Sequence, residues 1–203
     1  MKKKLFFAII LVSALVLIDQ IIKVCVKTSM LLGDEIRIFS WFRIHFIENE
    51  GMAFGLSFGP KVGKILLTIL RIVLIGVVIY LIRDMWKKQA KVWLNVALLM
   101  ILAGAIGNTI DGLFYGLLFN DSFMQVAHFM PDGGGYAGFC MGKVVDMFYC
   151  PLFDLPTWIP VVGGEKFFQP VFNFADTCIT IGVCVFIFGH LFSRTKRITQ
   201  SSN

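Results

Sequence analysis

The sequence predicts an all-α membrane protein with four transmembrane helices and two short strands near the outer membrane face. Hydrophobic residues make up 57% of the 203 residues and charged residues only 16%, whereas about a quarter of the residues in soluble domains are charged. Four long apolar stretches account for the helices, and they are separated by polar or aromatic connections. One connection, residues 36–50, alternates between apolar and polar residues as a strand does.

The four apolar stretches are long enough to cross a bilayer. A helix needs roughly 20 residues to span the hydrocarbon core, and backbone groups in lipid must hydrogen-bond within their own segment. We expect a single domain, residues 1–203, in which the connections 27–61 and 114–173 lie outside the membrane. The expected helices are at about residues 5–26, 62–82, 92–113 and 174–193.

The first apolar stretch could instead be a cleaved signal peptide, because a basic start precedes an apolar run and the small residues of "VSA" at 12–14. The apolar run continues through Ile18, however, and cleavage would leave the polar stretch from Asp19 to Lys23 without a purpose. We therefore expect this stretch to stay as the first helix.

Basic residues mark one side of the membrane. Residues 2–4, 83–91 and 194–197 are rich in Lys and Arg and contain one acid, Asp84. The positive-inside rule therefore places both termini and the 83–91 connection in the cytoplasm. The net charge of +6 then reflects topology and contact with anionic lipids, and it does not indicate a nucleic-acid partner.

The outer connections differ in pattern. In 36–50, apolar and polar residues fall on opposite parities, which predicts two short strands. The 114–173 connection should be irregular, with a flexible turn at "PDGGGYAG", 131–138, and with Trp158, Phe167 and Phe168 at the membrane interface. The cysteines of this connection, Cys140 and Cys150, could pair or stay free.

A small set of polar residues lies at or near those helix ends that the topology places outside. An ionisable residue in a spanning helix is costly and marks a functional site by default. Taken alone, Asn173 and Asp176 could be N-terminal caps, and Asp19 with Lys23 could be an i, i+4 ion pair. Their convergence at one depth favours a functional site. The set comprises Asp19, Gln20, Lys23, Asn108, Asp111, Asp146, Asn173 and Asp176.

Paired carboxylates carry a specific chemistry. Two that are forced close together cannot both ionise, so the pair holds one proton. The ionised member can take a proton from water, and the protonated member can donate to a carbonyl oxygen or a leaving amine. Such a pair would hydrolyse an amide without a metal or a cofactor. The three histidines are scattered, and no H-E-x-x-H, G-x-S-x-G or P-loop pattern occurs, which counts against zinc and serine hydrolases.

Five motifs resemble, in order, those of the lipoprotein signal peptidase (signal peptidase II) family of bacteria. Each is modestly specific alone, but together they cover nearly all of the chain except the outer inserts. The motifs are "DQIIK" at 19–23, "NEGMAF" at 49–54, "GAIGNTID" at 104–111, "VVDMF" at 144–148 and "FNFADTCI" at 172–179.

The resemblance implies a catalytic aspartate pair, Asp146 and Asp176. It implies a fold of four transmembrane helices with a small extracytoplasmic β-sheet cradle, to which segment 36–47 would belong. It also implies that further residues shape or line the site: Asp19, Lys23, Asn49, Gly51, Asn108, Asp111, Asn173 and Ala175.

The function implied by this resemblance is that of an aspartic endopeptidase. Members of the family remove the signal peptide of a prolipoprotein after a lipid has been attached to the cysteine that becomes the new N-terminus. The chain would then work in the bacterial cytoplasmic (inner) membrane, with lipid-modified prolipoproteins and membrane lipids as partners. The cyclic peptide globomycin would inhibit it. We expect a monomer without cofactor, metal or nucleic acid.

The sequence departs from the family pattern after Asp111. The family usually has Arg at the next position, where this chain has Gly112. Arg71 or Lys143 could supply the contact that this Arg makes.

The connections before and after Asp146 are also long for the family, and Met52 replaces a small residue. Loop length costs closure entropy only logarithmically, so the two acids of the expected pair can still meet. The inserts could form a lid over the site or tune substrate choice.

Two alternative hypotheses come from other classes. A small transporter or proton channel would use the intramembrane acids as a relay, but it should place polar groups through the whole membrane depth. The cytoplasmic halves of the expected helices are nearly without charge. A membrane scaffold would use the polar residues only to hold helices together, and removing their charges would then mainly affect stability.

Overall fold

The computed structural model describes residues 2–51, 60–158, 164 and 166–201, and the side chains in these ranges except those of residues 60 and 190–201. The chain divides into two compact units. The helical unit comprises Met1–Asp19, Ile69–Thr109 and Ala175–Asn203, and the sheet unit comprises Gln20–Thr68 and Ile110–Phe174. The single domain expected from the sequence stays a prediction.

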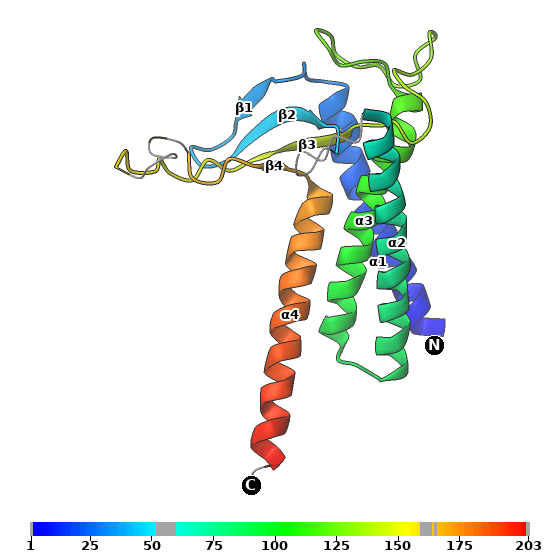
Figure 1. Cartoon of the computed structure of the whole chain (residues 1–203), viewed down its shortest axis with the longest axis vertical. Helices are drawn as coiled ribbons and strands as arrows, with labels where there is room; N and C mark the ends of the chain where they lie inside the picture. Colours follow the sequence, from blue (N-terminus) through cyan, green and yellow to red (C-terminus); the bar gives the residue numbers. More distant parts are fainter. Residues whose placement is uncertain (1, 52–59, 159–163, 165, 202–203) are drawn as a thin grey trace. The chain divides into compact units, whose positions relative to one another are not determined.

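Figure 1 shows the elements in chain order. They are α1 (Lys2–Lys27), β1 (Glu35–Arg37), β2 (Arg43–Asn49), α2 (Pro60–Lys87), α3 (Val92–Leu118), β3 (Val144–Tyr149), β4 (Val171–Phe172) and α4 (Phe174–Ser201).

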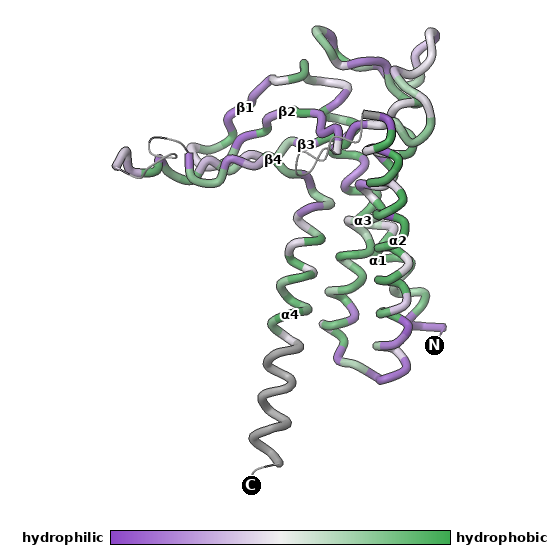
Figure 2. The backbone as a smooth tube through the Cα atoms, viewed as in Figure 1, coloured by the Kyte–Doolittle hydropathy of each residue, from purple (hydrophilic) through white to green (hydrophobic). Residues whose placement is uncertain are grey.

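The helical unit has a small core and an apolar exterior. Ala8 of α1, Val78 of α2 and Leu98 of α3 are buried in one cluster. Many other apolar side chains of these helices are exposed, and Val73 of α2 is 56% exposed. Figure 2 shows that long stretches of α1, α2 and α3 are hydrophobic, drawn in green. An apolar exterior of this kind suits a lipid environment.

Within the described residues, α1, α2 and α3 are long and apolar enough to cross a membrane. α4 contributes a shorter apolar stretch, Phe174–Gly189. The predicted all-α membrane fold with a small sheet is therefore confirmed.

A glycine lets α3 and α4 approach closely in the helical unit. A Cβ atom added at Gly104 would lie 2.3 Å from the backbone oxygen of Ala175 and 2.7 Å from Ile179 Cγ1. Close backbone approach at small residues is typical of helix contacts in membranes.

The sheet unit contains an antiparallel sheet with the strand order β1-β2-β3-β4. β3 lies between β2 and β4, so its register places the residues around Asp146. Ile47 of β2 is opposite Asp146, and Glu48 is opposite Val145. β3 is buried from Val144 to Met147, and it packs on a core that includes Phe46 and Tyr115.

The segment after α3 returns along the end of that helix. The backbone N–H groups of Ala137 and Gly142 donate to the carbonyls of Gly116 and Gly112, at 2.9 and 3.0 Å. A Cβ atom at Gly142 would lie 1.9 Å from the backbone oxygen of Asp111, so glycine is required at this contact. Within the predicted flexible turn, Gly135 also packs on α3, because a Cβ atom there would meet the backbone oxygens of Gly116 and Leu117, and only a residue without a side chain can approach a helix backbone this closely.

The predicted strands of residues 36–50 are confirmed as β1 and β2, but β3 and β4 lie in the connection expected to be irregular. The helices are also longer than predicted. α2 continues to Lys87 because Arg and Lys are good helix formers, and Lys88 forms an ion pair with Asp84 at 2.7 Å. α3 continues past residue 113 to Leu118, and the leucines of this extension are good helix formers.

The cysteines of the outer connection are free. Neither Cys140 nor Cys150 is in a disulfide. Burial raises the pKa of the Cys150 thiol, so that group stays protonated at neutral pH.

Candidate active site

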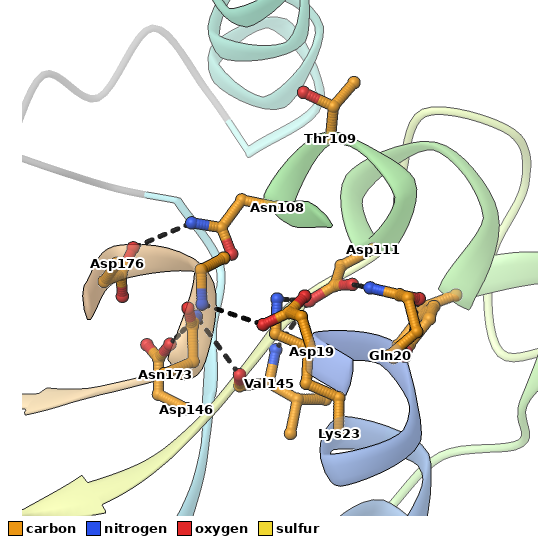
Figure 3. Close-up of polar contacts among 12 residues, drawn as sticks. Asp19, Gln20, Lys23, Asn108, Thr109, Asp111, Val145, Asp146, Asn173 and Asp176 are labelled. Atoms are coloured by element: carbon orange, nitrogen blue, oxygen red, sulfur yellow. Dashed lines mark hydrogen bonds and ion pairs between the residues drawn. The ribbon is translucent and has the colours of Figure 1, made fainter. Parts of the chain in front are cut away.

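All the predicted site residues except Asn49 and Gly51 belong to two hydrogen-bonded clusters, one in each unit. The close-up in Figure 3 draws the contacts of both. In each cluster, a buried aspartate holds a backbone amide, and an asparagine holds a second carboxylate.

In the helical unit, Asp19 caps the first turn of α4. Its Oδ1 accepts a hydrogen bond from the backbone N–H of Ala175 at 2.9 Å, and the side chain is buried. The first N–H groups of a helix have no partner within the helix, and a carboxylate interacts favourably with this end. Asp19 therefore fixes the residue that precedes Asp176.

Asn108 holds the carboxylate of Asp176 in the same unit. Its Nδ2 donates to Asp176 Oδ1 at 2.7 Å, and Asn108 is buried. Arg71 Nη1 donates to the backbone carbonyl of Asn108 at 3.3 Å. Of the two candidates for replacing the missing family Arg, Arg71 thus contacts a predicted site residue.

In the sheet unit, Asp111 is surrounded by donors. It forms an ion pair with Lys23 at 2.8 Å, and both side chains are 0% exposed. Gln20 Nε2 donates to Asp111 Oδ1 at 2.9 Å, and the backbone N–H of Val145 donates to Asp111 Oδ2 at 3.3 Å. A buried charge needs such partners. Asp111 therefore fixes the residue that precedes Asp146.

Asn173 holds the carboxylate of Asp146. Its Nδ2 donates to Asp146 Oδ1 at 2.6 Å and lies 3.3 Å from the backbone oxygen of Val145. Both Asp146 and Asn173 are buried. Asn173, the residue directly before α4, thus fixes the side chain of Asp146 in β3.

Asn49 and Gly51 form a turn at the end of β2. Asn49 Oδ1 accepts a hydrogen bond from the N–H of Gly51 at 2.8 Å. Gly51 has a φ of 76°, which favours glycine. A contact of either residue with substrate stays a prediction, and Met52 lies outside the described residues.

The structure thus brings together Asp19 with Ala175, Asn108 with Asp176, Lys23 with Asp111, and Asn173 with Asp146. Asp146 belongs to the sheet unit and Asp176 to the helical unit, and their sharing of a proton stays a prediction. Lys143 interacts with Glu48 at 3.2 Å, and this contact lies outside both clusters.

The sequence did not single out Gly107 as a site residue. A Cβ atom there would lie 2.6 Å from Asp19 Oδ2, so glycine makes room for the carboxylate. Its place directly before Asn108 in the "GAIGNTID" motif was the available signal. Within the described residues, no group of three or more His, Cys, Asp and Glu side chains is arranged to hold a metal ion.

Comparison with known proteins gives the family. The family model described as signal peptidase (SPase) II matches residues 11–192. The lipoprotein signal peptidase of Porphyromonas gingivalis (strain ATCC 33277) is 46% identical over 182 residues, which cover 87% of this chain and 79% of that protein. The lipoprotein signal peptidase of Amoebophilus asiaticus is 37% identical over 189 residues, which cover 90% of this chain and 75% of that protein.

Two solved structures of bacterial membrane enzymes share the fold. One has a TM-score of 0.63 at 25% identity and covers 92% of this chain and 93% of its own. The other has a TM-score of 0.62 at 23% identity and covers 94% of this chain and 90% of its own. The family match and the two relatives do not support the transporter or channel hypothesis. The chain belongs to the signal peptidase II family, the lipoprotein signal peptidases that remove signal peptides from prolipoproteins.

Proposed function

We propose that the chain is an aspartic endopeptidase in which Asp146 and Asp176 share one proton. The observation that supports this most is the matching environment of the two acids. Each accepts a hydrogen bond from an asparagine, Asn173 for Asp146 at 2.6 Å and Asn108 for Asp176 at 2.7 Å. An amide that fixes one carboxylate oxygen also sets the direction of the other, as a reacting pair requires.

The residues before the two acids are held in a matching way. The N–H of Val145 donates to Asp111, and the N–H of Ala175 donates to Asp19. Asp19 and Asp111 would therefore be positioning residues that act through the backbone. Lys23 would hold the carboxylate of Asp111 in place through their buried ion pair.

The reaction follows from one shared proton. The ionised acid takes a proton from a water molecule, and the resulting hydroxide attacks the scissile carbonyl carbon. The protonated acid donates to the carbonyl oxygen as it becomes tetrahedral. When the intermediate collapses, one of its hydroxyl protons passes to the acid that is now ionised, the C–N bond breaks, and the leaving amine takes a proton from the other acid, so that the pair again holds one proton. Either acid could hold the shared proton, so we assign the proton to the pair and not to one residue.

The substrate is a lipid-modified prolipoprotein, cut after the lipid has been attached. Its lipid tails would lie against the exposed apolar side chains of the helices, such as Val73 and Ile72. The basic residues at 2–4 and in the short α2–α3 connection support an orientation with both termini in the cytoplasm. The enzyme would then act as a monomer at the outer face of the inner membrane, and globomycin would inhibit it.

The test is cleavage of a lipidated precursor by the variants Asp146→Asn and Asp176→Asn, followed by mass measurement of the products. We expect each variant to lose about 10²–10⁴-fold in kcat, the range of general acid–base catalysis, while still inserting into the membrane. The matched control is Asp154→Asn, because Asp154 is a 65% exposed acid in an ion pair with Lys166. The control should keep full activity.

Near-normal turnover in either variant would remove the aspartate pair from the mechanism. An unlipidated twin of the precursor, offered in parallel, should remain uncut. Chelators should leave the rate unchanged, and a loss on chelation that zinc restores would indicate a metalloenzyme.

A further inference from the structure

A row of alternating charges runs through the sheet unit, outside the two clusters described above. The Nζ of Lys143 lies 3.2 Å from Glu48 Oε2 and 3.8 Å from Glu50 Oε1. At one end, Glu48 also forms an ion pair with Lys27. At the other end, Lys64 lies 3.8 Å from Glu50 Oε2. The row thus joins the end of α1, the end of β2, the start of β3 and the first turns of α2.

The Lys27 end of this row is a buried hydrogen-bonded triangle. Ser122 Oγ donates to Glu48 Oε1 at 2.7 Å and accepts from Lys27 Nζ at 2.8 Å. The side chains of Lys27 and Glu48 are 1% and 3% exposed. Burial alone would raise the pKa of Glu48, but the charge of Lys27, the hydrogen bonds and the charge of Lys143 together hold the pKa below its ordinary value. Glu48 is therefore ionised at neutral pH.

Stability alone does not explain such a buried triangle, because the free energy lost in desolvating an ion pair can equal the free energy gained from its attraction. A serine beside a lysine could suggest a nucleophile with its base. Ser122 is fully buried, and its oxygen is bonded to both Glu48 and Lys27. A substrate could not reach it, so a positional role remains.

The row holds one segment at two points, the residues before and after Asn49. Glu48 and Glu50 flank Asn49, and the turn to Gly51 follows directly. Side chains alternate along a strand, so Glu48 at the end of β2 points away from the side to which Asn49 points. The same row fixes the pairing of Glu48 with Val145, one residue before Asp146.

We propose that Lys27, Lys143 and Lys64 are positioning residues that hold residues 48–51, through Glu48 and Glu50, where this segment shapes the substrate groove. This inference rests on the proposed function. It adds to the family site a set of side chains drawn partly from the insert after α3, which supplies Ser122. The insert then contributes to substrate binding without touching the substrate.

The experiment compares Lys143→Met with the conservative variant Lys143→Arg in steady-state cleavage of the lipidated precursor. A substitution that weakens binding of the substrate and of the transition state equally raises KM and leaves kcat unchanged. We therefore expect Lys143→Met to raise KM about fivefold or more, with kcat unchanged. Lys143→Arg, which keeps the charge, should restore KM. The matched control is Lys166→Met, which removes the same charge from the 41% exposed partner of Asp154. Its KM should equal that of the wild type.

A stabilising role alone would lower the fraction of folded enzyme, and therefore the apparent kcat, without changing KM. That result, or an unchanged KM in Lys143→Met, would overturn the proposal. Lys64→Met tests the other end of the row if Lys143→Met does not fold, and the same increase in KM is expected.

Amide hydrogen exchange in residues 48–51 gives a readout that does not depend on cleavage. Exchange at Gly51 should be faster in Lys143→Met than in Lys166→Met, because the turn to Asn49 would be less firmly held. Equal exchange rates would refute the inference. A wild-type enzyme that does not cut the precursor would instead refute the proposed function, whatever the exchange rates show.

Discussion

Replacing Gly104 by alanine should separate α4 from α3 within the helical unit. The new Cβ atom would lie 2.3 Å from the backbone oxygen of Ala175, whereas ordinary van der Waals contact begins at 3.4 Å. A backbone oxygen cannot rotate away as the end of a side chain can. The two helices would therefore have to move apart by about 1 Å, and overpacking of this kind typically costs about 1–3 kcal/mol.

The displacement should also reach the candidate active site. Ala175 directly precedes Asp176, whose carboxylate is bonded to Asn108 at 2.7 Å. A shift of about 1 Å would stretch this bond beyond hydrogen-bonding range. A misplacement of this size at a reacting group can reduce the rate about 100-fold, so Gly104→Ala should lose kcat well beyond its loss of folded protein.

The assay is thermal unfolding in detergent together with cleavage of a lipidated precursor. The matched control is Gly76→Ala in α2, because a Cβ atom at Gly76 would have nothing within 4 Å. Alanine is the better helix former by about 1 kcal/mol, so this control should be at least as stable as the wild type and fully active. Wild-type stability and kcat in Gly104→Ala would refute the close approach of α3 and α4.

Two further predictions concern buried charges in the sheet unit. Lys23→Met should destabilise the protein by about 3–5 kcal/mol, because it leaves the charge of Asp111 buried without its ion pair; chemical denaturation measures this, and an added Asp111→Asn change should recover part of the loss. The pKa of Glu48 lies below its ordinary value of 4.5, so the stability that this group contributes is present above about pH 4.5 and lost as the pH falls through the lower, folded-state pKa. As the pH is lowered below about 4.5, the unfolding temperature of the wild type should therefore fall more steeply than that of Glu48→Gln. Parallel plots of unfolding temperature against pH would contradict the lowered pKa of Glu48.

The helices and the polar clusters could be predicted from the sequence for physical reasons. A bilayer requires long apolar helices, and an intramembrane acid is too costly to keep without a purpose. The contacts of Asp19 with Ala175 and of Lys23 with Asp111 are specific to the fold, however. They depend on which segments become neighbours, and the spacing of residues along one chain does not contain that information.

The strands of the outer connection were harder to predict. β3 is buried on both faces, so it has no alternation of apolar and polar residues to mark it as a strand. β4 has only two residues, Val171 and Phe172, which is too short for any period. The triangle of Lys27, Glu48 and Ser122 was missed because its members are far apart in sequence and none of them belongs to a recognised motif.

The return of the chain along the end of α3 changes what the length of the insert means. The backbone N–H of Gly142 donates to the carbonyl of Gly112. The segment that connects this fixed point to Asp146 therefore begins at residue 142 and is only a few residues long. The loop between α3 and this hydrogen bond leaves the helix and returns to it. Its length therefore does not change how far Asp146 lies along the chain from the last residue fixed on α3. Related chains can therefore lengthen, shorten or rewrite that loop while the start of β3 remains anchored beside Asp111.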